Sequence, residues 1–204
     1  MQDYWHKRGI KNLRNIGFDS VEEIERRNLM ERKNYLEYLP TEKKVSCLDI
    51  ACGLGRLTSW LSNDLNYEVT AFDTVSQYVE KTQCTSPTAT VVQSTVETFE
   101  GTKFDVVFSS GIALYVPINS LYSLCKRSTR PGSILFLRDT FAIGKTFEIH
   151  AAHLDDYRAN YKHMDEVLDC FLKNGEFELL SQKFLFDYSI EKKTHKSLII
   201  LRRL

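Results

Sequence analysis

The sequence has no excess of charge of either sign, because 27 Lys and Arg residues are balanced by 27 Asp and Glu residues. A protein without net charge has no general electrostatic attraction for nucleic acids or anionic membranes, although local patches can still form. The composition therefore favours a small-molecule partner, and neither nucleic acid nor membrane is expected as a partner.

The sequence also has no C-x-x-C pair among its five cysteines, which are Cys47, Cys52, Cys84, Cys125 and Cys170. Structural zinc sites and disulfide-stapled domains usually show closely spaced cysteines. We therefore expect neither a metal site nor a disulfide framework. Cys47 and Cys52 are expected to be small core residues.

No apolar run approaches the roughly 18 residues of a membrane span, and residues 1–8 lack the apolar stretch of a signal peptide. No internal repeat or low-complexity linker divides the chain. Because about 200 residues suit one domain with a substantial core, we expect a single domain over residues 1–204 in a soluble, cytoplasmic protein.

The most informative segment is residues 45–57, in which an apolar run ends at an acid and two closely spaced glycines follow. The pattern predicts a buried strand, a tight turn and the start of a helix. Glycine lets the backbone approach a ligand closely, and the N–H groups of a helix N-terminus favour an anion. A small ligand with a carboxylate is therefore expected beside Gly53 and Gly55.

The spacing of these residues separates two classes of nucleotide-binding protein. A dinucleotide-binding fingerprint needs a third small residue three positions after Gly55, where this chain has Thr58. The segment instead resembles motif I of the class I S-adenosylmethionine-dependent methyltransferases, an acid followed by G-x-G-x-G. Asp49, Ala51, Gly53 and Gly55 hold the motif positions, with Ala51 in place of the first glycine. The resemblance implies S-adenosylmethionine as the cofactor and these four residues as part of its site.

A second acid lies at the end of the next predicted strand, residues 67–72. Asp73 follows Asp49 by 24 residues, the length of one strand–helix–strand unit. The resemblance implies that Asp73 accepts hydrogen bonds from both ribose hydroxyls, with Thr74 beside it in the cofactor site. The spacing alone indicates a nucleoside without saying which one. The alternative is an aspartate that caps the turn before Val75.

The remaining cofactor contacts are implied by the resemblance at two later strand ends. Where relatives carry an acid that binds the adenine amino group, this chain has Thr95, followed by Val96, whose backbone N–H would meet the ring. A hydroxyl lacks the charge of a carboxylate, and a plain strand-to-helix cap is the alternative for Thr95. Near the end of the strand 104–111, the carbonyl near Ser109 would hold the methionine ammonium.

The alternation of predicted strands and helices indicates an α/β, three-layer sandwich with a parallel sheet. The resemblance implies a Rossmann-like sheet of seven strands, mostly parallel, in a core over residues 45–204. The last two strands are expected to form an antiparallel hairpin. The predicted strands are 45–50, 67–72, 89–93, 104–111, 133–137, 177–186 and 195–201, and the predicted helices are 56–65, 73–83, 119–127 and 165–173.

Residues 1–40 have apolar positions at helical intervals and predict two or three helices that end near Pro40. One interpretation is an amphipathic cover packed on an edge of the sheet. The other follows from the resemblance, because small-molecule relatives often carry an N-terminal helical lid. Tyr4 and Trp5 would then close over the cofactor or the substrate.

Candidate acceptor-binding residues follow two of the predicted strands. Ligands bind beyond the carboxyl ends of parallel strands, so Tyr115 is expected to overlook the transferred methyl group, with packing on the sheet as the alternative. Arg138 is expected to clamp a substrate carboxylate or phosphate. Its alternative is a surface ion pair with Asp139 or Asp105.

Residues 150–161 occupy the region in which relatives often carry substrate-recognition residues. Tyr157 and Tyr161 are four residues apart and are predicted to share one helix face, with His153 on the same stripe. Together with Arg158 they would form a polar wall for a small hydroxylated or anionic substrate. Core packing of the stripe is the alternative.

The sequence therefore predicts an S-adenosylmethionine-dependent methyltransferase that acts on O or N of a small molecule. Tyr115 and His153 are the catalytic candidates. An amine or hydroxyl acceptor would also require a group that takes up its proton, which the sequence does not identify. No metal is expected, since His150 and His153 lack a third ligand at suitable spacing. The alternatives are a non-catalytic S-adenosylmethionine-binding subunit, a protein or RNA methyltransferase, and a nicotinamide-dependent oxidoreductase.

Overall fold

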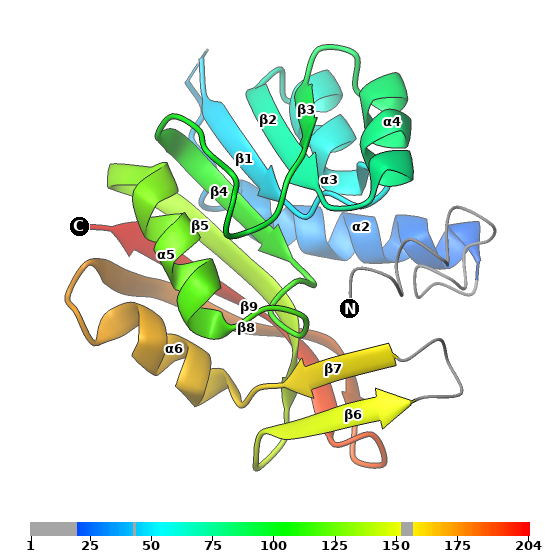
Figure 1. Cartoon of the computed structure of the whole chain (residues 1–204), viewed down its shortest axis with the longest axis vertical. Helices are drawn as coiled ribbons and strands as arrows, with labels where there is room; N and C mark the ends of the chain where they lie inside the picture. The colour runs from blue at the N-terminus through cyan, green and yellow to red at the C-terminus, as the bar shows by residue number, and fades with distance from the viewer. Residues whose placement is uncertain (1–19, 43, 152–156) are drawn as a thin grey trace.

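A seven-stranded sheet forms the centre of the computed structural model, which describes residues 20–42, 44–151 and 157–204 (Figure 1). The strand order is β3-β2-β1-β4-β5-β9-β8, and β1 to β5 are parallel, whereas β8 and β9 are antiparallel to their neighbours. This confirms the predicted sheet and its closing hairpin. The strands are β1 (Ser46–Ile50), β2 (Glu68–Asp73), β3 (Thr90–Gln93), β4 (Phe104–Ser110), β5 (Thr129–Ala142), β8 (Phe177–Ser189) and β9 (Thr194–Arg203).

Helices cover both faces of this sheet and make three layers, which confirms the predicted α/β sandwich. The helices are α2 (Val21–Leu36), α3 (Arg56–Ser59), the π-helical segment η2 (Trp60–Asp64), α4 (Ser76–Thr85), α5 (Ile118–Ser128) and α6 (Met164–Leu172). Residues of α2, α3 and η2 share one apolar cluster with the strands, and residues of α5 and α6 share the other. Successive strand residues alternate between the clusters, as Cys47 and Leu48 do, because both faces of a parallel sheet are buried.

The helix α2 is the part of the predicted N-terminal cap that the structure describes. Ser20 caps it by accepting a hydrogen bond from the N–H of Glu23 at 3.1 Å. Near its end, the fully buried Tyr35 packs edge-on against Phe108 and Phe136, with ring centroids 5.1 and 5.3 Å apart. These two phenylalanines belong to the central strands β4 and β5, so α2 covers the middle of the sheet. For α2 the interpretation of a cover on the sheet edge is therefore wrong.

The helix predicted over residues 56–65 changes its hydrogen bonding halfway. After α3 ends at Ser59, the chain continues as η2, and the N–H of Leu65 bonds to the carbonyl of Trp60 at 3.2 Å, five residues back. Trp60 and Leu61 stay buried. The segment is thus helical as predicted, although the helix type is different.

The prediction that Tyr157 and Tyr161 share one face of a helix is wrong. Residues Tyr157–Tyr161 form the strand β7, which pairs antiparallel with β6 (Phe147–Ala151) in a separate two-stranded sheet. Residues four apart share a face in a strand as they do in a helix, because side chains alternate with a period of two. The sequence spacing therefore does not distinguish the two, and the pairing partner in β6 decides for the strand.

Candidate cofactor and acceptor site

The turn after β1 places three residues in the left-handed backbone region, with φ of +55° at Ala51, +57° at Gly53 and +78° at Gly55. A Cβ atom on Gly55 would lie 2.8 Å from both Cγ2 and Oγ1 of Thr82, so this position has no room for a side chain. The Oγ1 of Thr82 in turn donates a hydrogen bond to the carbonyl of Gly53 at 2.9 Å. Helix α4 therefore fixes the turn from one side.

Asp73 lies at the end of β2 and contacts the same turn. Its Oδ2 accepts a hydrogen bond from the N–H of Gly53 at 2.9 Å, and its Oδ1 accepts one from the N–H of Val75 at 3.0 Å. The bond to Val75 is the turn cap that the sequence left as an alternative. The bond to Gly53 shows that the structure brings together the two elements predicted to bind a nucleoside. Thr74 lies next to them, and its carbonyl accepts a hydrogen bond from the side chain of Gln93.

Asp49 precedes the turn and is hydrogen-bonded to the helix α3 that follows it. It is 1% exposed and accepts a hydrogen bond from Oγ1 of Thr58 at 2.6 Å. Burial raises the pKa of Asp49 to about 6, and the bond from Thr58 opposes that shift. The residue that departs from the dinucleotide pattern, Thr58, thus holds the motif acid against the start of α3.

The predicted adenine contacts lie in a turn after β3. Oγ1 of Thr95 accepts hydrogen bonds from the N–H groups of Glu97 and Thr98 at 3.2 and 3.1 Å. Thr95 therefore has the capping role that was the alternative to an adenine contact, although it caps a turn and not a helix. The side chain of Val96 is buried in the core. Ser109 is buried in β4 beside Ile50 of β1.

The charged pair Arg138–Asp139 lies within β5, which continues to Ala142, and its side chains point to opposite faces of the sheet. Arg138 donates from Nε to Glu31 of α2 at 2.7 Å, so its guanidinium lies in an ion pair under that helix. Neither predicted alternative partner takes part, because Asp105 pairs with Arg130 and Asp139 faces the other side. Strand alternation explains the separation, since successive side chains point to opposite faces. Because the guanidinium of Arg138 is paired with Glu31, the structure does not support the expected role of Arg138 as a substrate clamp.

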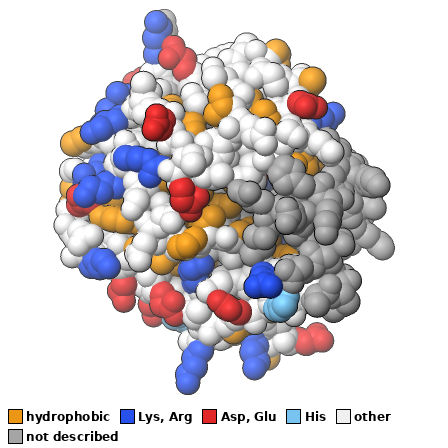
Figure 2. Space-filling model, in the orientation of Figure 1, with side chains coloured by type: hydrophobic (Ala, Val, Ile, Leu, Met, Phe, Trp, Pro, Cys, Tyr) orange, Lys and Arg blue, Asp and Glu red, His pale blue; other side chains and the backbone are white. Residues whose placement is uncertain are grey.

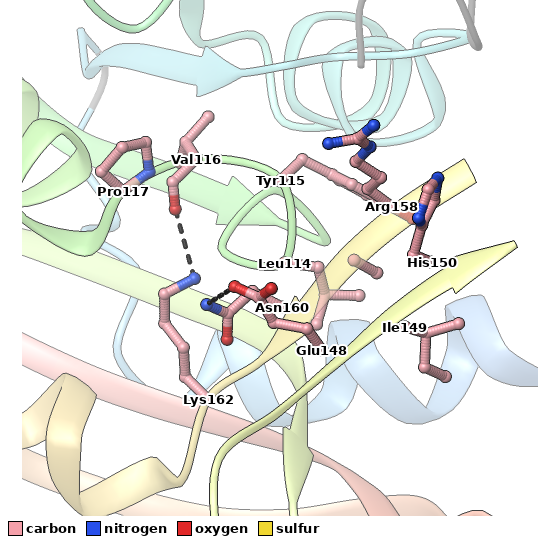
Figure 3. Close-up of a pocket in the computed structure, with 11 residues that line it drawn as sticks. Leu114, Tyr115, Val116, Pro117, Glu148, Ile149, His150, Arg158, Asn160 and Lys162 are labelled. Carbon is pink, nitrogen blue, oxygen red and sulfur yellow. Dashed lines mark hydrogen bonds between the residues drawn. The ribbon is translucent and has the colours of Figure 1, made fainter. Parts of the chain in front are cut away.

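A cavity of about 540 Å³ lies between the loop after β4 and the β6–β7 hairpin (Figure 3). Arg158 and His150, opposite each other in the hairpin register, lie at one end, and Pro117 and Lys162 lie at the other. Its lining residues are Leu114, Tyr115, Val116, Pro117, Glu148, Ile149, His150, Arg158, Ala159, Asn160 and Lys162.

Two of the predicted acceptor residues, Tyr115 and Arg158, line this cavity, and a third, Tyr157, contacts Tyr115. The hydroxyls of Tyr115 and Tyr157 are 3.4 Å apart, and the rings meet edge-to-face with centroids 6.3 Å apart. Tyr161 stacks on Phe147 of the hairpin, with centroids 5.0 Å apart. Tyr4, Trp5 and His153, the other candidates, lie outside the described residues.

The loop that carries Tyr115 is held by two buried charges. The Oδ2 of Asp139 accepts a hydrogen bond from the N–H of Ala113 at 2.7 Å. The ammonium of Lys162 donates to the carbonyls of Ala113 and Val116, the latter at 3.2 Å. Burial raises the pKa of Asp139 and lowers that of Lys162. Sequence reasoning missed Lys162, since a single lysine in a polar stretch carries no local signal.

Within the described ranges no helix is long and apolar enough to cross a membrane. Nor do those residues gather three or more His, Cys, Asp or Glu side chains in an arrangement able to hold a metal ion.

The seven-stranded sheet has the fold of solved Rossmann-like methyltransferases. Residues 48–137 match the family described as methyltransferase domain. The matched segment runs from β1 into β5 and includes the glycine turn and Asp73. No curated protein matches the sequence.

Solved structures share the fold over most of the chain at low sequence identity. Geranyl diphosphate C-methyltransferase from Streptomyces coelicolor A3(2) has a TM-score of 0.73 at 12% identity, covering 90% of this chain and 82% of that one. PH0226 from Pyrococcus horikoshii OT3 has a TM-score of 0.72 at 16% identity, covering 91% and 93%. The glycopeptide N-methyltransferase MtfA has a TM-score of 0.65 at 18% identity, covering 87% and 94%. At these identities the similarity concerns the fold.

Proposed function

We propose that the protein transfers a methyl group from S-adenosylmethionine to an oxygen or nitrogen atom of a small-molecule acceptor. The observation that carries this proposal is the hydrogen bond between Gly53 and Asp73. It places a glycine turn and a carboxylate side by side at the ends of adjacent strands. Two structures of the same fold are complexes with S-adenosylhomocysteine and S-adenosylmethionine, respectively.

The residues of the turn fit this cofactor. A Cβ atom on Gly53 would meet no other atom within 4 Å, so the backbone there borders open space. The N–H groups at the start of α3 suit the carboxylate of the amino-acid end. The carboxylate of Asp73, which is 7% exposed, suits the ribose hydroxyls, because an ionised carboxylate accepts several hydrogen bonds at once.

The cavity beside Tyr115 supports a small acceptor. Its volume of about 540 Å³ lies in the range of small-molecule sites. On the face shown in Figure 2, acidic and basic side chains of the described residues are interspersed, without a broad basic surface for nucleic acid. The structural neighbours that methylate geranyl diphosphate and a glycopeptide also act on molecules other than nucleic acids.

The cofactor supplies a methyl group already activated by the positive charge of its sulfonium. The protein must therefore mainly align the acceptor and exclude water. Burial beside Tyr157 raises the pKa of Tyr115, so that the Tyr115 phenol stays protonated at neutral pH. In this proposal Tyr115 orients the acceptor as a hydrogen-bond donor, while Tyr157 and Arg158 line the acceptor side.

Titration calorimetry with S-adenosylmethionine and NADH tests the cofactor. We expect binding of S-adenosylmethionine alone at micromolar levels, and Asp73→Ala should weaken it at least tenfold. Asp105→Ala is the matched control, because that carboxylate pairs with Arg130 away from the turn and should leave the affinity unchanged. Unchanged affinity in Asp73→Ala would remove the ribose assignment, and binding of NADH instead would favour an oxidoreductase.

Release of S-adenosylhomocysteine in the presence of pooled metabolites tests the transfer itself. Release that depends on one pool identifies the acceptor. Tight binding without turnover on any pool would instead favour a non-catalytic S-adenosylmethionine-binding subunit.

A further inference from the structure

A single buried carboxylate connects α2 to two other elements of the fold. Glu31 of α2 is fully buried, and its Oε1 accepts hydrogen bonds from Arg138 of β5, with Nε at 2.7 Å and Nη2 at 2.5 Å. Its Oε2 lies 2.8 Å from Nη1 of Arg56, which is the first residue of α3. The same Nη1 donates to the side chain of Asn28, one turn earlier on α2, at 2.7 Å.

Arg56 lies next to the cofactor turn, and Arg138 contacts the loop on the acceptor side of the site. Arg56 directly follows Gly55 and opens the helix whose N-terminus faces the cofactor turn. The backbone carbonyl of Arg138 accepts a hydrogen bond from the N–H of Gly111 at 2.8 Å, where the loop that carries Tyr115 begins. Displacing Glu31 therefore removes a contact from the cofactor side and from the acceptor side together.

Because Glu31 is charged and buried, its ion pairs with the two arginines depend on accurate placement of the charged groups. The two guanidinium groups hold the pKa of Glu31 below its ordinary value although burial acts in the opposite direction, so the carboxylate is ionised. A buried ion pair is stable only when its partners are well placed, and removing one partner leaves a charge uncompensated. The side chain of Arg56 is 24% exposed and that of Arg138 is 11% exposed, so loss of Glu31 frees Arg56 to move into solvent more readily.

We propose that Glu31 is a positioning residue for cofactor binding, which fixes the first turn of α3 and the glycine turn before it through Arg56. The docking of α2 and the binding of S-adenosylmethionine are then coupled, because each favours the same arrangement of residues 51–58. This inference rests on the proposed function for the identity of the ligand. A purely structural role for Glu31 would instead stabilise α2 without altering the turn.

A double-mutant cycle separates these two roles. We expect Glu31→Gln and Arg56→Met each to weaken S-adenosylmethionine binding about tenfold in titration calorimetry. The double variant should bind no more weakly than either single one, because both changes remove the same contact. Additive losses in the double variant would overturn the inference. Arg56→Met keeps the pair between Glu31 and Arg138, so it provides a folded variant even where Glu31→Gln is poorly stable.

Two controls on the same segment test whether any loosening of α2 is sufficient. Glu37→Gln removes an exposed ion pair between the end of α2 and Lys183. Leu39→Ala removes a buried side chain from the apolar cluster that also contains Tyr35 of α2. Both should bind S-adenosylmethionine like the unaltered protein at temperatures well below unfolding, although Leu39→Ala should unfold earlier. A tenfold loss of affinity in Leu39→Ala would show that general loosening explains the effect, and would overturn the inference.

Amide hydrogen exchange without ligand gives a readout that does not depend on the proposed function. In Glu31→Gln and Arg56→Met, the amides of residues 52–59 should exchange faster, while those of the β8–β9 hairpin should not change. Unchanged exchange of residues 52–59 would overturn the inference whatever the ligand. A protein that binds no S-adenosylmethionine yet shows the faster exchange would refute the proposed function and support the positioning role.

Discussion

Gly55 is the position at which the structure makes the sharpest demand on residue type. Its φ is +78°, and a Cβ atom there would lie 2.8 Å from two side-chain atoms of Thr82. Thr82 is fully buried and donates a hydrogen bond to the carbonyl of Gly53, so it has little freedom to move away. Gly55→Ala therefore combines backbone strain with a steric clash.

The expected cost follows from these two effects. A left-handed conformation costs an L-residue about 1–2 kcal/mol, and overpacking in a well-packed region costs about 1–3 kcal/mol. Against this, replacing glycine lowers the entropy of the unfolded chain and returns about 0.4–1 kcal/mol. Gly55→Ala should lower the free energy of unfolding by roughly 1–5 kcal/mol as the sum of these terms.

Gly132 is the matched control, because its φ is +88° but a Cβ atom there would meet nothing within 4 Å. Gly132→Ala carries the backbone strain without the clash and should cost only about 1 kcal/mol. Urea denaturation followed by circular dichroism measures both variants, and the two midpoints can be compared if the m-values agree.

The clash can also be relieved on the other side. Thr82→Ala removes the colliding atoms, so in the Gly55→Ala background it should cost about 1–3 kcal/mol less than in the unaltered protein. The reasoning is refuted if Gly55→Ala costs no more than Gly132→Ala, or if the two changes at positions 55 and 82 are additive.

Two further predictions concern the same turn. Ala51 has a φ of +55°, so Ala51→Gly should raise the free energy of unfolding by about 0.5 kcal/mol, as relief of strain exceeds the added chain entropy; a lower urea midpoint would contradict this. Burial raises the pKa of Asp49 from 3.8 to about 6, so between these pH values the native state keeps a proton that the unfolded state releases. Stability should therefore fall by up to roughly 3 kcal/mol as the pH rises through this window. Asp49→Asn should flatten that slope in urea denaturation between pH 4 and pH 7, and an equal slope in both proteins would show that Asp49 is not its source.

The turn and the sheet were predictable because their signals lie in contiguous residues. The apolar run before Asp49, the two glycines after it and the distance to Asp73 define a strand, a turn and the next strand. The parallel sheet then brings Gly53 and Asp73 into contact, since adjacent parallel strands end at the same edge. The hairpin β6–β7 was not predictable in this way, because the spacing of Tyr157 and Tyr161 fits a strand and a helix equally.

The sequence by itself thus determined the α/β class, the glycine turn after the first strand and the strand that ends at Asp73. Only the tertiary structure decided the partners of the buried charges. Arg138 pairs with Glu31, 107 residues away, and Lys162 bonds to carbonyls 46 and 49 residues away. Local periodicity carries no information on such pairs, because they depend on which helix packs on which strand. The burial that this packing creates is what makes each charge require a partner.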